Sequence, residues 1–231
     1  MSLALTRDSE AHGAAFDLAA MVKAQDQTFE AVRRVAAAVR PGMTEIEACA
    51  RADQIIADMG ADRTWHKHVI RFAQGTLETF HAPFDADRQL GERDIFFVDL
   101  GVVFGGHEGD AGDTFVTGHD PEMLACAQAA RDLWADVAAH WRASGVSGAA
   151  LYDYATQRAE AMGWTLNLEV RGHRVCDFPH AIYRAGALGD FGLCPTTGLW
   201  ILEIQIAHPT RPFGAFFEDL LIGETASSET R

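Results

Sequence analysis

Basic residues and long apolar runs are both scarce in this sequence. Its 231 residues include 19 Lys and Arg against 33 Asp and Glu, which gives a net charge of −14. This deficit argues against nucleic acid as a partner, because phosphate binding needs clustered basic side chains. No apolar window reaches the length of a membrane span, and the first residues show no signal-peptide pattern. We therefore expect a cytoplasmic protein that binds neither nucleic acid nor membrane.

Cysteine is sparse as well. The four cysteines, Cys49, Cys126, Cys176 and Cys194, are irregularly spaced, which argues against a disulfide framework. The pattern His173-x-x-Cys176 resembles half of a zinc site, but the sequence has no second pair at matching spacing. Cys176 is better interpreted as a small buried apolar residue.

Helical and extended patterns alternate along the chain. Helical periodicity from about residue 10 to residue 39 is followed by a second helix, which begins after Thr44 with Glu47 as its capping-box partner. Residues 64–73 predict a strand, in which Trp65, His66 and His68 would form either a pocket wall or an aromatic-rich core strand. A further strand, 95–104, completes this half.

The same order returns about a hundred residues later. Asp120-Pro121 begins a helix that runs to about residue 143, and Ser147 caps the next one. Gly145-x-Ser147 matches Gly42-x-Thr44 at an offset of 103. This duplication predicts two similar units around a pseudo-twofold axis. Since no linker rich in Pro, Gly or Ser separates them, we expect a single domain over residues 1–231.

Acids interrupt two strongly apolar runs that contain no Lys or Arg. Asp99 lies within residues 95–104 and Asp110 follows eleven positions later, while Glu203 lies within residues 199–206 and Glu218 follows. A buried charge costs several kcal/mol unless it is paired or bound to a cation. A lone acid in a strand more commonly faces water at an edge. Two such pairs in duplicated apolar surroundings favour metal ions as the missing partners.

The expected turns bring each pair of acids together. A two-residue turn at Gly105-Gly106 would place Asp99 opposite Gly112, with Asp110 diagonal to Asp99 on the same sheet face. A turn over residues 209–212 would place Glu203 directly opposite Glu218. Four carboxylates can neutralise two adjacent divalent ions, which suits hydrolysis by a bridging water.

Histidines add nitrogen ligands or proton donors to this pattern. His173 follows Gly172 at what reads as a strand end, where it would serve either as a metal ligand or as a hydrogen-bonded core histidine. His81 and His180 have weaker individual cases, because nothing in their spacing alone separates a catalytic from a structural role.

The chain resembles the pita-bread metallopeptidases: methionine aminopeptidases, aminopeptidase P, prolidase and their relative creatinase. The resemblance covers roughly residues 15–225 and implies an α+β fold of duplicated helix-helix-strand units around a curved antiparallel sheet. It implies a metal ligand set in the family's chain order, which here reads Asp99, Asp110, His173, Glu203 and Glu218.

The resemblance also implies roles around the reaction. Glu203 would act as proton shuttle, and His81 and His180 would contact the scissile amide. The cofactors would be two divalent ions, with Mn, Co, Zn and Fe all suited to such ligands. The substrate would be a small peptide or amide, and a homodimer is left open.

Three places depart from the family pattern. Arg174 follows the ligand histidine where glycine is usual, Asp113 stands where arginine is common, and Ile204-Gln205 replaces Pro-Gly after the fourth ligand. We expect these departures to lie around the substrate pocket and to change specificity more than metal binding.

The sequence therefore predicts a dinuclear metal-dependent hydrolase active in proteolysis, an aminopeptidase or Xaa-Pro-type peptidase. Two alternatives stay open: an inactive binding module on the same fold, and a creatinase-like hydrolase that cleaves a C–N bond without metal.

Overall fold

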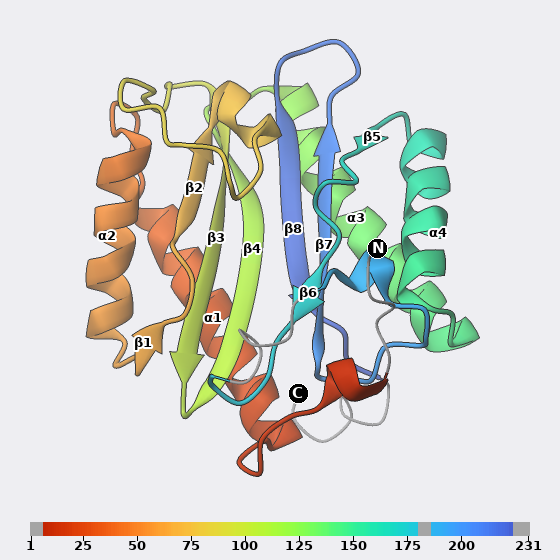
Figure 1. Cartoon of the computed structure of the whole chain (residues 1–231). Coiled ribbons are helices and arrows are strands. Elements are labelled where there is room, and N and C mark those ends of the chain that lie inside the picture. Colours follow the sequence, from red (N-terminus) through yellow and green to blue (C-terminus); the bar gives the residue numbers. More distant parts are fainter. Residues whose placement is uncertain (1–6, 180–185, 224–231) are drawn as a thin grey trace.

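The computed structural model describes residues 7–179 and 186–223. One eight-stranded sheet has the order β1-β3-β4-β8-β7-β5, with β2 also beside β3 and β6 also beside β7 (Figure 1). The helices are α1 (Leu18–Ala38), α2 (Glu45–Asp58), α3 (Pro121–Ser144) and α4 (Gly148–Ala161). The strands are β1 (Arg63–Thr64), β2 (Val69–Phe72), β3 (Asp94–Phe104), β4 (His107–Thr117), β5 (Thr165–Leu166), β6 (His173–Arg174), β7 (Trp200–Ala207) and β8 (Gly214–Leu220).

The element order confirms the predicted repeat. Two helices and four strands in the first half are followed by two helices and four strands in the second, and the sheet order is symmetric about the β4–β8 pair. The two halves meet where Gly112 of β4 pairs with Glu218 of β8. A Cβ at Gly112 would lie 2.5 Å from the Phe216 ring, so only glycine permits this close approach.

Helix caps lie where the sequence places them, with one exception. Thr44 and Glu47 form the reciprocal capping box of α2, and Asp120 and Ser147 cap α3 and α4. The prediction that α1 begins near residue 10 is wrong. Its N-cap is Asp17, whose backbone is extended, so the helix begins only at Leu18. The Asp17 carboxylate accepts a hydrogen bond from Ala20 N at 2.8 Å.

The strand predicted over residues 64–73 is also wrong in its continuity. The pairing of β2 with β3 is offset by two residues from the pairing of β1 with β3, so residues 65–68 bulge out of the ladder. Trp65 N still donates to Gly101 O at 3.1 Å, and the chain returns to regular pairing where Val69 faces Asp99. Because of this bulge, the side chain of His66 does not take the direction that it would have in a regular strand.

Both acid-bearing hairpins have the predicted register. Gly105 and Gly106 form the first turn with φ of +55° and +74°, values that favour glycine. Asp99 faces Gly112, and Glu203 faces Glu218. Because side chains alternate along a strand, the four carboxylates share one face of the sheet.

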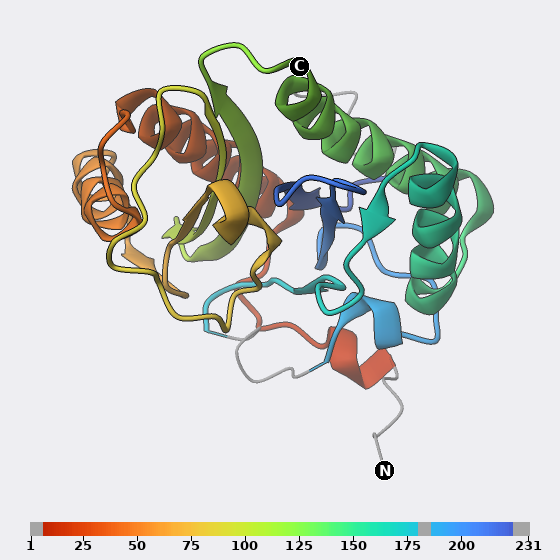
Figure 2. The same ribbon diagram turned by 90° about the horizontal axis from the view of Figure 1, so that it is seen from above.

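The helices cover the opposite face. Val98, Leu100 and Val102 alternate with Asp99 and pack in a core with residues of α1 and α2. Leu202 and Ile204 alternate with Glu203 and pack with α3 and α4. Seen from above, the helices lie along one side of the curved sheet, and the other side is covered by loops (Figure 2). Among the residues described, no helix is both long and apolar enough to cross a membrane.

Candidate metal centre

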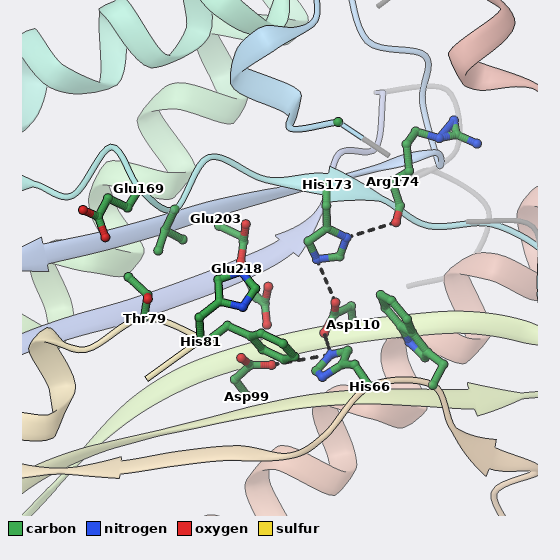
Figure 3. A pocket seen from close by; sticks show the side chains of 14 residues that line it. His66, Thr79, His81, Asp99, Asp110, Glu169, His173, Arg174, Glu203 and Glu218 are labelled. Carbon is green, nitrogen blue, oxygen red and sulfur yellow. Dashed lines mark hydrogen bonds and ion pairs between the residues drawn. The ribbon is translucent and has the colours of Figure 1, made fainter. Parts of the chain in front are cut away.

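A cavity of about 410 Å³ lies on the sheet face opposite the helices, above the four acids. Figure 3 shows acids and histidines from both halves of the chain gathered around it, whereas the side chain of Arg174 extends away from them. The cavity is lined by Trp65, His66, Thr79, Phe80, His81, Asp99, Asp110, Glu169, Val170, His173, Arg174, Gly186, Glu203 and Glu218. The structure thus brings together all four predicted acids, His173 and His81.

Asp110 is the centre of this arrangement. Its two carboxylate oxygens each contact a different imidazole: Oδ2 lies 2.9 Å from His173 Nε2, and Oδ1 lies 3.0 Å from His66 Nε2. The two rings approach the carboxylate from opposite sides (Figure 3). Asp110 is only 1% exposed, so these contacts are shielded from water.

The main chain of Asp110 is held by a side chain of α1. Gln25 Nε2 donates to Asp110 O at 2.6 Å, and Asp110 N donates to Gln25 Oε1 at 2.9 Å. The buried amide satisfies both backbone groups as a neighbouring strand would. Gln25 Nε2 also donates to Asp219 Oδ1, which ties α1 to β8 at the same level. This clamp fixes the carboxylate against both hairpins.

Glu203 is held in a similar way by the second half. Tyr152 of α4 donates its hydroxyl hydrogen to Glu203 O at 2.9 Å, and Gly172 N donates to Glu203 Oε2 at 2.7 Å. Gly172 has φ of +67°, and a Cβ there would lie 2.4 Å from Ile201 O. Glycine is therefore required before His173 for two independent reasons.

His66 reaches the site because of the bulge after β1, whereas its sequence pattern predicts only a pocket wall or an aromatic-rich core strand. Its Nε2 also lies 3.7 Å from Asp99 Oδ1. Space for the ring comes from Gly101, where a Cβ would lie 1.9 Å from His66 Cδ2. Gly101, two residues after Asp99 on the same strand face, was the one sequence signal that could have located this histidine.

Crowding of the acids shifts their pKa values strongly. Burial, with repulsion from neighbouring carboxylates, raises the pKa of Asp99 to about 7 and the pKa of Glu218 well above its usual range. Burial also raises the pKa of Glu203. Burial opposes ionisation of Asp110 too, but the charges and hydrogen bonds of the two imidazoles outweigh it and lower its pKa to about 2.

The two imidazoles shift in the opposite sense. Burial disfavours their charged forms, but the charge and hydrogen bond of Asp110 outweigh that effect. They raise the pKa of His66 to about 9 and the pKa of His173 to about 10. The site therefore holds carboxylates that repel one another and need positive charge, whether from protons or from cations.

The donor set fits divalent metal ions. Two groups of ligand atoms lie within 4.8 Å of one another, one from His66, Asp99 and Asp110, the other from Asp110, His173 and Glu218. Asp110 belongs to both, as a carboxylate bridging two ions would. Glu218 Oε1 is buried and has no hydrogen-bond partner, and such an orphaned oxygen is costly unless a cation satisfies it.

The loop that carries His81 is tied to the second half of the molecule. Gln205 Nε2 donates to Thr76 O and to Glu78 O, both at 3.0 Å. His81 itself is exposed at the cavity mouth, where its ring contacts the edge of Phe80. His180, the other predicted catalytic histidine, lies outside the described residues.

The three departures from the family pattern were predicted to surround the pocket, and the structure shows that this prediction is wrong for two of them. Arg174 lines it, but Asp113 lies on the opposite strand face, where it pairs with Arg131 at 2.8 Å. Ile204 packs into the helix-covered core. Gln205 supports the His81 loop from below. Strand alternation explains the error, because Asp113 is three residues from Asp110 and so faces the other way.

An antiparallel sheet with helices on one face and a carboxylate-histidine cluster on the other places this protein in the class of α+β proteins with a candidate metal centre on the open face of the sheet. The model of metallopeptidase family M24 matches residues 19–222, and the chain belongs to this family. A comparison with curated protein sequences found no match.

Solved structures share the fold at low sequence identity. X-Pro aminopeptidase from Thermotoga maritima MSB8 is 17% identical with a TM-score of 0.74, over 90% of this chain and 58% of that one. Prolidase from Pyrococcus furiosus is 17% identical with a TM-score of 0.74, over 94% and 64%. Methionine aminopeptidase from Thermotoga maritima is 18% identical with a TM-score of 0.68, over 97% and 96%.

These likenesses identify the α+β pita-bread fold predicted from the sequence. The chain spans about three-fifths of the length of the X-Pro aminopeptidase and the prolidase.

Proposed function

We propose that this protein is a dinuclear metal-dependent hydrolase that cleaves a peptide or amide bond, as an aminopeptidase or Xaa-Pro-type peptidase. The observation that carries the proposal is the pair of ligand groups that share Asp110 beneath a cavity large enough for a small peptide. Membership of the metallopeptidase family M24 supports it. Asp99, Asp110, His173, Glu203 and Glu218 are the proposed metal ligands.

When bound, two divalent ions would lower the pKa of a water molecule and polarise the substrate carbonyl. Glu203 would accept the proton from the attacking water, because a carboxylate that contacts both a bound ion and the water is placed to take it. The bond from Gly172 N fixes Oε2, so Glu203 keeps one orientation as the proton moves. His81 would donate a hydrogen bond to the developing oxyanion from the cavity mouth.

The charge around the cavity favours a substrate with a free amino terminus. Five acids line it, and Arg174 is the one basic residue among the described lining apart from the histidines. Four of the acids would be neutralised by metal ions, which leaves Glu169, an exposed residue at the edge. Glu169 would attract the substrate's ammonium group and select against internal segments of a long chain.

The test is a screen of metal-reconstituted protein against N-terminal Met peptides, Xaa-Pro dipeptides and Xaa-Pro-Xaa peptides. We expect turnover that a chelator abolishes, and we expect Asp110→Asn to lose bound metal and turnover together. The matched control is Asp113→Asn on the same strand, because Asp113 faces away from the cavity. Retained metal and hydrolysis in Asp110→Asn would disprove the site assignment.

Two other results would redirect the proposal. Activity that survives the chelator would favour the metal-independent C–N hydrolase. Full metal binding with no turnover on any peptide would favour a binding module.

A further inference from the structure

Among the described residues, His66 contacts the acid cluster but has no function in the proposed five-ligand set. Its ring contacts the carboxylates directly. Its Nε2 lies 3.0 Å from Asp110 Oδ1 and 3.7 Å from Asp99 Oδ1, and the three atoms fall within one potential ligand group. Atoms that share an ion at about 2.1 Å lie roughly 3–4 Å apart, so these separations match those of atoms bound to a common metal.

The ring is oriented as a metal ligand would be. His66 Nδ1 lies 2.7 Å from Lys67 O, and donation to this carbonyl keeps Nε2 directed toward the carboxylates, where it would bind an ion once it has lost its proton. Metal-bound histidines commonly have their second nitrogen held by a backbone carbonyl in this way. His173 has the same arrangement, with Nδ1 3.0 Å from Arg174 O and Nε2 toward Asp110.

The surroundings of His66 hold it in this position. The edge of the Trp65 ring packs against it at a centroid distance of 4.7 Å, and Trp65 Nε1 is anchored to Gly109 O at 3.0 Å. On the other side Gly101 leaves space that any side chain would fill. The position is therefore built by two residues of the same half, an aromatic that supports the ring and a glycine that admits it.

We propose that His66 is a sixth protein ligand of the metal centre and supplies a nitrogen to the ion held by Asp99 and Asp110. The inference rests on the proposed function, because it requires that the centre binds metal. Without His66 the ligands of that ion would all be carboxylates. A nitrogen ligand shifts the preference of such a site from Mn²⁺ toward Zn²⁺ and Co²⁺.

The alternative is a positioning role, in which His66 only donates a hydrogen bond to Asp110. The two roles differ in how many imidazoles contact metal. With His173 alone, protein loaded with two Zn²⁺ ions contains one bound imidazole for two ions. With His66 as well, it contains one bound imidazole for each ion.

X-ray absorption of the protein loaded with Zn²⁺ measures this number directly. We expect an average of one imidazole per zinc in the wild type and half that value in His66→Phe, which keeps a ring of similar size. His68→Phe is the matched control, because His68 lies two residues away and pairs with Asp53 instead of facing the acids. It should leave the number unchanged.

Zinc titration by calorimetry gives a second readout. We expect His66→Phe to weaken one of the two sites by more than the roughly 10- to 100-fold loss typical of residues that only orient a ligand. The preference of that site for Zn²⁺ over Mn²⁺ should fall as well. His66→Gln keeps a hydrogen-bond donor, so it should restore zinc affinity if His66 only positions Asp110. It should not restore the number of imidazoles per zinc.

The outcomes separate this inference from the proposed function. If the wild type binds two zinc ions with an average of half an imidazole per zinc, the proposed role of His66 is overturned and the five-ligand centre stays intact. A wild-type protein that binds no zinc and no manganese would overturn both. Because the wild-type number decides the question, the test stands even if His66→Phe does not fold.

Discussion

The two halves of this molecule have the same elements in the same order, but they hold their acids differently. The first hairpin joins two strands of eleven residues through a two-residue turn and sets its acids diagonally. The second joins strands of eight and seven residues and sets its acids face to face. Each half also presents one imidazole to Asp110, His66 from a bulge and His173 from a short strand.

The asymmetry of the site arises outside the duplicated hairpins. The hairpins retain the repeat because their register follows from strand alternation. The segments between the helices and the hairpins diverge, and they carry the residues that distinguish the halves: His66 and the His81 loop in one, Gly172 and His173 in the other.

Glu203→Gln and Asp99→Asn should separate the chemical contributions of the two hairpins. We expect Glu203→Gln to lower kcat by about 10²- to 10⁴-fold with little change in KM, because it removes the proton acceptor. It should lose less metal than Asp99→Asn, because Asp99 belongs to a group of clustered ligand atoms and Glu203 lies outside both groups found among the described residues. Asp99→Asn should mainly lower metal content, and excess metal should partly restore its activity. Steady-state kinetics with metal analysis of both variants checks this. Equal loss of metal in the two would contradict the contrast.

Gln25→Ala and Tyr152→Phe should differ in their effect on stability. Gln25→Ala leaves both the N–H and the C=O of buried Asp110 without partners, at about 1–3 kcal/mol for each group. Tyr152→Phe removes the 2.9 Å bond to Glu203 O and the longer 3.3 Å bond from Glu203 N. Because Glu203 is only half-buried, we expect a smaller total loss, about 1–3 kcal/mol. Denaturant unfolding of the metal-free proteins measures both. A larger loss in Tyr152→Phe would show that the second half is the more tightly held.

The metal-free protein should lose stability as the pH rises. Folding raises the pKa of His66 to about 9 and of His173 to about 10, from an unfolded value near 6.5. Their contribution is therefore complete below about pH 6.5 and is lost as the pH rises through 9 and 10. The raised pKa of Asp99 acts in the same direction from about pH 4 to 7.

Thermal unfolding of chelator-treated protein between pH 6 and pH 10 checks this expectation. Zinc-loaded protein is the control, because bound metal keeps both imidazoles deprotonated and should remove most of the slope. His66→Phe should flatten the lower part of the curve. A Tm that stays constant over this range without metal would contradict the shifted values.

The helix caps should give the smallest effects. Thr44 and Ser147 occupy matching positions in the repeat, and each accepts a backbone N–H at 3.2 Å. We expect Thr44→Ala and Ser147→Ala each to cost about 1 kcal/mol. Only Thr44 has a capping-box partner, so the loss of Thr44 should also weaken the bond between Glu47 and Thr44 N. Chemical denaturation, compared with Thr156→Ala inside α4, measures the contribution of the caps alone.

Features governed by local rules could be predicted from the sequence. The Gly105-Gly106 turn and the alternation of apolar residues determine which face Asp99 and Asp110 share, and the same reasoning gives the facing glutamates. The capping residues likewise mark where α2, α3 and α4 begin. These rules predict that the four acids share one face of the sheet, because the register of each hairpin depends only on its own turn and strands.

What escaped prediction depends on contacts between distant segments. The break after Thr64 results from packing of Trp65 against Gly109 and of His66 against Gly101, residues more than thirty positions away. The role of Gln205 depends on a loop from the other half. Asp113 is different, because strand alternation from Asp110 already predicts that its side chain faces away from the cavity. Only the family pattern placed it near the pocket.

Gln205 also bears on how this molecule can be altered. It belongs to the second half, but its amide supports the loop that brings His81 to the cavity from the first half. The two units therefore cannot be exchanged with those of a relative one at a time, since a graft of either alone would separate a histidine from its support. Evolution or engineering of substrate choice here must change strand β7 and the His81 loop as a single inherited block.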